Sequence, residues 1–594
     1  MPNKTIKEQA IHLVKTEKQS WEDATVFITE KIAFMMRNLI RQNRKNYWGI
    51  FDQQVDPTTG RKKIWVPMTE VLTEAVVKNI DLDTKDINFR AKKASAIGLT
   101  SLVRNVIKNY LDNTYFGEDL DMTLRQLAMD GTAVWKTTEE YNEELGKKVA
   151  KRRIVDLLNF YIDPTAESIN TTGSVIERAV ISIDEFKSMK DWFNKDEVQG
   201  TTEVSKNDEY LTNTNPRTEI KYVEIFERWG KIPKSFITGN EKDTDLVEGQ
   251  IVCSAVNGSW KLHYIAKNTK GVKPYEECWM TRVPGRWYGK GVPEKIMMLQ
   301  LWINTIVNIR INRSYISQLG IFKIKKNAGI TPQMLSRLPA NGAVPVNSMD
   351  DIEQMVMSEA SQASYKDEDV INGWAERLTS AFEVVTGESM PSSTTATAIA
   401  TQTRTAQSAF ALIKEGVGFF LQRWVKRQLM PIVQKSITKE EVYRVTGEIE
   451  EVRELDNVIV DKALFEQISA IMASGEMVDE MQIERVRQDA LAQLGSQGKD
   501  RFVTLMNDIN LTDYDVQVYI TNEEVDKGVL TQNLISILQL APEYKDVVLR
   551  QAFDIMGLDS YQLKKPIMNP MNPMMPQGMP QTQNPQEVFT NANI

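Results

Sequence analysis

Apolar residues recur every three or four positions from Ile6 to about Arg44, and this spacing predicts helices at the start of the chain. The stretch "DPTTGR" at 56–61 lies between two β-favouring runs and predicts a hairpin. Helical spacing returns over 69–80 and 93–130. The apolar positions of the first pattern include Val26, Ile32, Phe34, Met35, Leu39 and Ile40.

Between 131 and 283 the pattern changes to short β-favouring runs. Segments such as "EIKYVEIFERWGKI" and "GQIVCSAVNGSWKLHYIA" are rich in β-branched and aromatic residues, and Gly, Pro, Asn and Asp separate them. We therefore expect a strand-rich region within a mainly helical α+β protein.

The middle of the chain predicts a helical hairpin with a decorated tip. Helical spacing from about Pro293 to Leu319 predicts a helix about 40 Å long, with an amide at every fourth position from Gln300 to Asn312. Prolines and glycines break 321–355 into a small α/β insertion, and a second helix follows from about Glu359 to Val385.

Most of the circumference of the first helix is apolar, and neighbouring copies of the chain could cover what one chain leaves exposed. We expect packing between copies to involve Ile296, Leu299, Trp302, Ile303, Ile306 and Val307.

The segment 386–405 is half Ser and Thr, and its only charged residues are Glu388 and Arg404. Composition alone fits a flexible linker. A long helix is expected from about Ala396 to Ser436, where Gly416, Gly418 and Pro431 are possible kinks.

The rest of the chain is more broken. We expect β-favouring structure at 440–461, helices at 462–507, a strand at 514–521 and helices at 524–557. Prolines recur through 564–594, which predicts a disordered tail rich in Pro, Met and Gln that cannot fold alone.

Composition narrows the classes of function. The chain has 594 residues, 42% apolar and 26% charged, so several folded regions are expected. A net charge of −8 argues against a protein that grips nucleic acid over its whole surface. Neither Cys253 and Cys278 nor His12 and His263 stand at metal-ligand spacing, so we expect packing or surface roles, with no metal and no cofactor.

The sequence gives no sign of a membrane protein. The N-terminus lacks the apolar core of a signal peptide, and the longest apolar stretch, 296–309, is too short to cross a bilayer. We expect a chain that folds in the cytoplasm with reduced thiols.

Basic residues concentrate in two zones. No Asp or Glu occurs between Lys295 and Met349, and from Ser389 to Lys439 the one acid is Glu415. These zones are either solvated helix faces or contacts with a polyanion or an acidic partner. Their basic residues are Lys295, Arg310, Arg313, Lys323, Lys325, Lys326 and Arg337, and then Arg404, Lys414, Arg423, Lys426, Arg427, Lys435 and Lys439.

The stretch "PGRWYGKGVPEK" at 284–295 only superficially resembles a phosphate-binding loop. Three residues, not four, separate Gly285 from Gly289, and Gly291 stands where a hydroxyl should hold magnesium. A turn before a helix, with Pro293 in its first turn, is the better interpretation. We therefore expect no enzyme activity and no catalytic residues.

This stretch, together with the order of the segments, resembles the portal proteins of tailed double-stranded-DNA bacteriophages. The family enters a long helix with Tyr-Gly-x-Gly/Ser-x-x-Glu, matched here by Tyr288, Gly289, Gly291 and Glu294. The segments that follow also match the family: a Pro-rich tip, a second helix, a small-residue loop, a long helix and a Pro/Met/Gln tail. The resemblance covers about 285–440 well and the flanks loosely.

The resemblance implies a portal fold with eight segments. They are a wing at 1–290, the first stem helix at 291–319, a clip at 320–355, the second stem helix at 356–385, a tunnel loop at 386–396, a kinked helix with return strands at 397–461, crown helices at 462–563, and the tail at 564–594.

The resemblance also implies function. Portal proteins form a ring, usually of twelve copies, at one capsid vertex of the virion, assembled in the host cytoplasm, and double-stranded DNA is packaged and ejected through it. Expected partners are the terminase large subunit, head–tail adaptors and the major capsid protein, with no membrane. The tunnel would be lined by Ser389, Met390, Ser392, Ser393, Thr394 and Thr395, and the clip would carry a basic patch of Lys323, Lys325, Lys326 and Arg337.

Two other classes of protein remain open. A packaging ATPase or nuclease would need a complete phosphate loop or carboxylates spaced for two metals, and neither is convincing here. Another structural component, such as a head–tail connector or a scaffold, would generally be smaller, or more uniformly helical and charged.

Overall fold

The computed structural model describes most of the chain up to residue 436 and short pieces beyond it. The described residues are 4–22, 25–29, 32–56, 60–81, 87–91, 107, 110–143, 147–202, 221–240, 242–318, 321–326, 329–331, 333, 346, 348–355, 362–381, 396–436, 460, 464, 484–490, 492 and 514–518. The chain divides into two compact units, Met1–Ile520 and Thr521–Ile594, and all described residues belong to the first.

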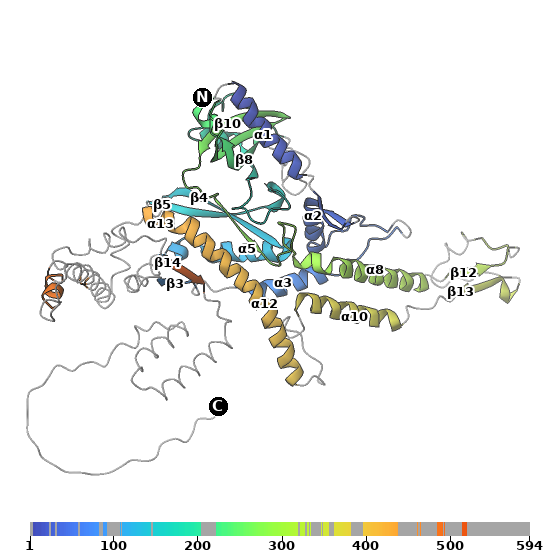
Figure 1. The fold of residues 1–594 in the computed structure, drawn as a ribbon. Coiled ribbons are helices and arrows are strands. Elements are labelled where there is room, and N and C mark those ends of the chain that lie inside the picture. The colour runs from blue at the N-terminus through green and yellow to red at the C-terminus, as the bar shows by residue number, and fades with distance from the viewer. Residues whose placement is uncertain are drawn as a thin grey trace, which may run out of the picture. The chain divides into compact units, whose positions relative to one another are not determined.

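A five-stranded antiparallel sheet forms one part of this unit (Figure 1). Its strand order is β10-β9-β8-β7-β6. Helix α1 (Lys4–Glu22) packs on it through Ile6, Ala10 and Val14, which recur every four residues and are buried. The strands are β6 (Phe160–Tyr161), β7 (Ser174–Ser182), β8 (Tyr222–Pro233), β9 (Leu246–Val256) and β10 (Ser259–Lys267), and the short helices beside them are the 3-10 helix η3 (Leu157–Asn159), α6 (Ile183–Ser188) and α7 (Ser235–Thr238).

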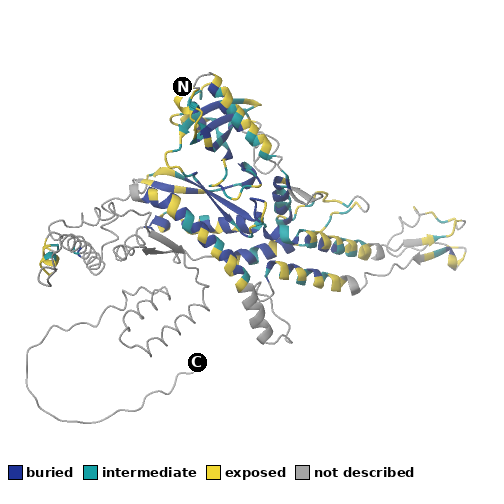
Figure 2. Cartoon of the chain, viewed as in Figure 1, coloured by how far each residue is buried: buried dark blue, intermediate teal, exposed yellow. Residues whose placement is uncertain are grey.

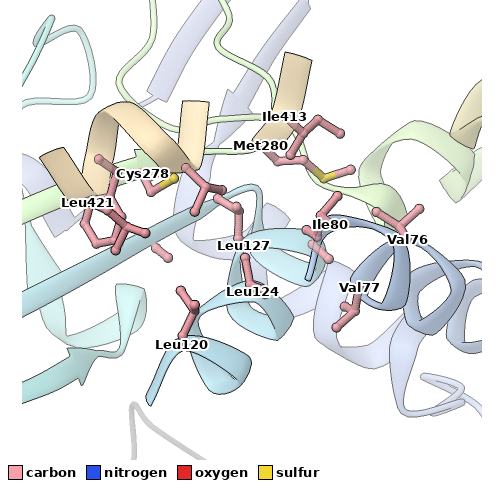
Figure 3. Close-up of a cluster of buried hydrophobic side chains, with 14 of the residues drawn as sticks. Val76, Val77, Ile80, Leu120, Leu124, Leu127, Cys278, Met280, Ile413 and Leu421 are labelled. Atoms are coloured by element: carbon pink, nitrogen blue, oxygen red, sulfur yellow. The ribbon is translucent and has the colours of Figure 1, made fainter. Parts of the chain in front are cut away.

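A three-stranded sheet and several helices share the largest core. The sheet has the order β11-β4-β5, from β4 (Thr132–Asn142), β5 (Lys147–Val155) and β11 (Tyr275–Trp279). Figure 3 shows where its strands meet helices α3 (Met68–Ile80), α5 (Phe116–Asp130) and α12 (Ala396–Trp424). The side chains that meet there include Val76, Ile80, Leu124, Leu127, Cys278, Met280, Ile413 and Leu421.

Four aromatic rings fix α12 against this sheet. The Trp135 ring lies 4.7 Å from that of Phe420 and 5.1 Å from that of Trp424, and the Phe116 ring stacks on Trp424 at 5.8 Å. Both indoles bond to threonine hydroxyls: Trp135 Nε1 to Thr123 and Trp424 Nε1 to Thr137. A satisfied indole N–H removes the main cost of burying tryptophan.

Three glycines hold the strand-rich region against the start of α8 (Val292–Gln318). A Cβ built on Gly291 would lie 2.7 Å from the Met129 carbonyl oxygen and 2.8 Å from the Gly131 nitrogen, and one on Gly289 would overlap the Gly131 oxygen. Gly131 itself has φ +81° and ends α5. Glycine is required here because backbone meets backbone with no room for a side chain.

Polar contacts close the same junction. The Gly289 amide donates to the Thr132 hydroxyl at 2.7 Å, and the Met280 amide donates to the Gly131 oxygen. Arg286 Nη2 binds Glu294 Oε2 at 2.9 Å in the first turn of α8. The residues that match the family's helix entry therefore have a structural role, with Glu294 held by a buried arginine.

Helix α8 runs beside α10 (Gln362–Thr379), and the short strands β12 (Ile321–Ile324) and β13 (Ile352–Met355) pair beyond it (Figure 1). A 3-10 turn, η4 (Met349–Asp351), precedes β13. The predicted long helix is confirmed; of the small α/β insertion predicted at 321–355 the structure describes the two paired strands and η4, and 334–345 lie outside the described residues. The second helix is shorter than predicted: it ends at Thr379, where Ser380 takes φ +59°, and residues 382–385 lie outside the described residues.

The long helix predicted from Ala396 to Ser436 has those bounds but deforms at one place. Helix α12 runs straight through Gly416 and Gly418; a π-helical turn, η5 (Val425–Leu429), then leads into α13 (Met430–Ser436). Pro431 explains the position, because its ring clashes with the carbonyl four residues earlier in a regular helix.

The prediction of helices alone from Ile6 to about Arg44 is wrong in part. Helices α1 and α2 (Met36–Tyr47) are as expected, but β1 (Thr25–Thr29) and β2 (Ile32–Met35) form a hairpin between them. Val26, Ile32, Phe34 and Met35 therefore belong to strands. The β-branched run "TVFIT" outweighs the approximate helical spacing.

Other predictions stand. The hairpin predicted around 56–61 has a bridge from Val55 to Lys62, with 57–59 outside the described residues, and α3 matches 69–80. The strand expected at 514–521 is β14 (Tyr514–Val518), which pairs with β3 (Ile87–Ala91). Residues 484–490 are helical, while 437–459 and the tail at 564–594 lie outside the described residues.

Replacing Gly291 with Ala should destabilise the protein by about 2 kcal/mol or more, because the new methyl group meets only backbone atoms. The measurement is the thermal unfolding temperature of the purified chain. Gly373→Ala in α10 is the control: nothing lies within 4 Å of its Cβ position, and alanine there should be neutral or stabilising by up to about 1 kcal/mol. Equal effects of the two substitutions would contradict the close contact.

Candidate functional site

The helical pair α8–α10 is the first candidate functional site. Ile303 and Val307 of α8 share a core with Ile371 and Ala375 of α10. Arg310 Nη2 binds Glu368 Oε2 at 2.6 Å, and its guanidinium lies 4.4 Å from the Tyr365 ring centroid. The two helices are therefore fastened along their length by apolar packing and at Arg310 by an ion pair.

Of the six residues predicted to pack between copies, five are covered at least in part by their own chain and one is exposed. Ile296, Ile303 and Val307 are buried within the chain, and Leu299 and Ile306 are half-buried against the same core. Trp302 is 59% exposed. The structure thus covers most of the predicted set internally and leaves Trp302 as the member that a neighbour could contact.

A second apolar face runs along each of the two helices, outside their shared core. Figure 2 shows exposed positions alternating with buried ones on α8 and α10. The recurrence every three or four residues puts most of the exposed apolar side chains on one face of each helix. They are Met298, Leu301, Trp302 and Ile309 on α8, and Val370, Trp374 and Leu378 on α10.

The amide stripe of α8 binds the backbone of an extended segment. Asn308 exchanges two hydrogen bonds of 2.8 Å with the backbone of Ile64. Asn304 accepts from the Val66 amide at 2.9 Å, and Gln300 bonds both the Val66 carbonyl and the Thr69 amide. Farther along, Asn312 binds the Asp56 carboxylate.

The hydrogen bonds between the amides of α8 and the segment 64–69 are called here the amide ladder. Their spacing follows from the rise per residue of a helix and of an extended chain. Four residues of helix advance about 6 Å, and two residues of extended chain advance about 6.6 Å, so amides four apart meet alternate residues of the segment. The stripe thereby acts as a substitute strand and satisfies backbone groups that would otherwise lie unpaired against the helix. The sequence revealed the stripe but not its partner.

The predicted basic patch of the clip is largely paired. Lys323 lies opposite Glu353 in the β12–β13 ladder with 3.4 Å between Nζ and Oε2, and Lys325 lies 3.8 Å from Asp351. Lys326 is exposed, and Arg337 lies outside the described residues. The segment without Asp or Glu ends at Met349, just before Asp351 and Glu353. The pairing of β12 with β13 brings these two acids beside the lysines of that segment. Basic character along the sequence therefore overstates that of the tip.

The predicted tunnel residues Ser389, Met390, Ser392, Ser393, Thr394 and Thr395 lie outside the described residues. Helix α12 begins directly after them, at Ala396.

Two adjacent buried glutamates of β11 lie near the end of the long helix, and the carboxylate of Glu276 contacts its arginines. Glu276 Oε1 lies 3.4 Å from Arg427 Nη1, its Oε2 lies 3.6 Å from Arg423 Nε, and Arg423 Nη2 also donates to the Glu277 carbonyl. Burial raises the pKa of both carboxyls, that of Glu277 to about 7, although a hydrogen bond from the Ile169 amide opposes the shift. No sequence signal marked these two residues as partners of the long helix.

The cysteines and one histidine have packing roles. Cys253 and Cys278 are buried, and burial raises the pKa of Cys278 to about 12. His263 bonds the Phe193 carbonyl and the Ser254 hydroxyl. In the part of the chain that the structure describes, no three His, Cys, Asp or Glu side chains gather as metal ligands would. Nor does any described helix combine the length and apolarity needed to cross a membrane.

The described chain thus has a helix entry through close-packed glycines, a two-helix arm with a paired tip, and a long helix with a π-turn. The family model described as "Phage SU10 portal protein" matches residues 105–457, more than half of the chain. The chain therefore belongs to the phage SU10 portal protein family, whose members are structural components of the virion, and the resemblance drawn from the sequence is confirmed. A search of curated proteins found no match.

Replacing Asn304 with Leu should leave the Val66 amide without its acceptor. We expect a loss of about 1–3 kcal/mol and faster hydrogen exchange at Val66. Thr305→Ala is the control, since the Thr305 hydroxyl bonds its own helix at Leu301. If exchange at Val66 stayed slow in Asn304→Leu, the ladder would not hold the segment.

Glu277 should make the stability of the protein depend on pH. Its folded-state pKa of about 7 exceeds the ordinary value of 4.5, so its contribution to stability is present at low pH and lost as the pH rises through about 7. Glu277→Gln keeps an acceptor for Ile169 and removes the ionisation. The variant should unfold at a higher temperature than the parent above pH ~7, with the difference vanishing below pH ~4.5. A difference that did not change with pH would contradict this.

Proposed function

We propose that the chain assembles into a closed ring of identical copies, twelve in number, at one vertex of the capsid, and that double-stranded DNA is packaged and later ejected through its centre. The observation that carries the proposal is the second apolar face of α8 and α10, since each helix already buries one face in the chain itself. Exposed apolar faces of this extent mark surfaces of association.

The chemistry of the central loop suits a channel. In this proposal 386–396 lines the tunnel, and its Ser, Thr and Met side chains form no strong ion pairs with phosphate. Each such pair would add a barrier to sliding, so weak contacts keep translocation smooth. The acidic net charge limits adhesion of DNA elsewhere.

The tip formed by β12 and β13 would dock the terminase large subunit during packaging and head–tail adaptors afterwards. Its paired Lys323 and Lys325 and the exposed Lys326 offer mixed charge, which favours specificity of docking over adhesion to DNA. The strand-rich region would contact the major capsid protein. A head–tail connector without a DNA channel is the second candidate, supported by the same apolar face.

Trp302→Glu should prevent ring formation. Burying a charge where an indole packs costs about 3 kcal/mol per contact, which is about a hundredfold in the affinity of each neighbour. Mass photometry of the purified chain gives the copy number, and particles assembled with the variant should retain no DNA. Tyr141→Glu is the matched control, because Tyr141 is 64% exposed and lies on β4, away from the helical pair. A Trp302→Glu ring of normal mass would refute the proposed contact, and a ring without DNA retention in the parent would favour the connector.

A further inference from the structure

A groove of about 660 Å³ lies between the π-turn and the loop from β10 to β11. Its walls carry four basic side chains: Lys270 from the loop, and Arg423, Lys426 and Arg427 from the end of α12 and the π-turn. Val272, Pro431 and Ile432 are among its apolar lining residues. Three members of the second basic zone of the sequence thus converge with a lysine that is distant along the chain.

The loop and the π-turn are held in fixed relation. Gln428 Nε2 donates to the Lys273 carbonyl at 2.8 Å. The Asn268 side chain spans its own loop, donating to the Val272 carbonyl and accepting from the Lys270 amide. Because both walls are tied by buried or local hydrogen bonds, the spacing of the four cations is set before any ligand arrives.

The acids nearby neutralise these cations in part. Glu276 is fully buried and contacts Arg423 and Arg427 at 3.6 and 3.4 Å, and Glu139 lies 3.7 Å from Lys270. Lys426 makes no ion pair with any described residue. Arg427 has five N–H donors, and its one described hydrogen bond, to Glu276, is long. The groove therefore keeps a positive excess and unused donors on side chains that reach solvent.

We propose that this groove, called here the π-turn groove, binds a phosphate group of the backbone of duplex DNA. Two guanidinium and two ammonium groups around one groove match a phosphodiester better than a carboxylate, because a tetrahedral phosphate accepts donors from several sides. The choice of DNA rests on the proposed function, which places the chain beside the packaged genome.

The test uses Lys270→Gln/Lys426→Gln, which removes two exposed charges and leaves the buried arginine–glutamate contacts intact. Lys151→Gln/Lys187→Gln is the matched control, since both lysines are also exposed and neither lines the groove. Fluorescence anisotropy of a short labelled duplex is recorded with the full-length assembled protein over a series of salt concentrations.

Two lost phosphate contacts should weaken DNA binding by about tenfold or more and lower the salt slope by about 1 to 2. The control should bind like the parent, and inorganic phosphate should compete with DNA in the parent and the control but not in Lys270→Gln/Lys426→Gln. Equal binding by both variants would overturn the proposal. The proposal would also be overturned if Lys270→Gln/Lys426→Gln lost binding to poly-glutamate but bound DNA like the parent, because the ligand of the groove would then be an acidic protein. Mass photometry of the same samples separates the two proposals: absence of a ring counts against the proposed function, while the anisotropy series still decides on the groove.

Discussion

The contact between the backbones of Gly131, Gly289 and Gly291 is the constraint on which the rest of the structure depends. It joins the end of α5 to the residues directly before α8 without intervening side chains, so the direction in which α8 leaves the strand-rich region is fixed by backbone packing. Arg286 then holds Glu294 in the first turn, and the amide ladder continues the attachment to Asn312. In the proposed ring, α8 presents one face to its own chain and another to a neighbour, and a fixed exit direction suits both contacts.

The sequence predicted those features whose signal is local. The period of four in the amides of α8, the two ends of the long helix at Ala396 and Ser436, and the hairpin across 56–61 were all readable, because each depends on residues near one another in the chain. The family resemblance likewise rested on Tyr288, Gly289, Gly291 and Glu294. These residues also proved to form the junction, so a motif and a packing requirement coincide at this place.

What the sequence could not show depends on partners far along the chain. Nothing near Gly291 indicates Gly131, nothing near Asn304 indicates Val66, and β14 pairs with β3 across most of the described chain. Charge behaved in the same way: Lys323 and Lys325 looked unopposed until the hairpin brought Glu353 and Asp351 beside them. In contrast, Arg423, Lys426 and Arg427 gained a further cation, Lys270. Folding therefore reduced one basic zone and reinforced the other.

Single-particle electron microscopy of the purified full-length chain tests the central claim most directly, that α8 and α10 line up beside identical neighbours around an opening. The account predicts a closed ring with a central channel, in which Trp302 of each copy is covered by the next. A particle without a central opening, with the exposed apolar face of α8 covered by its own subunit, would contradict it.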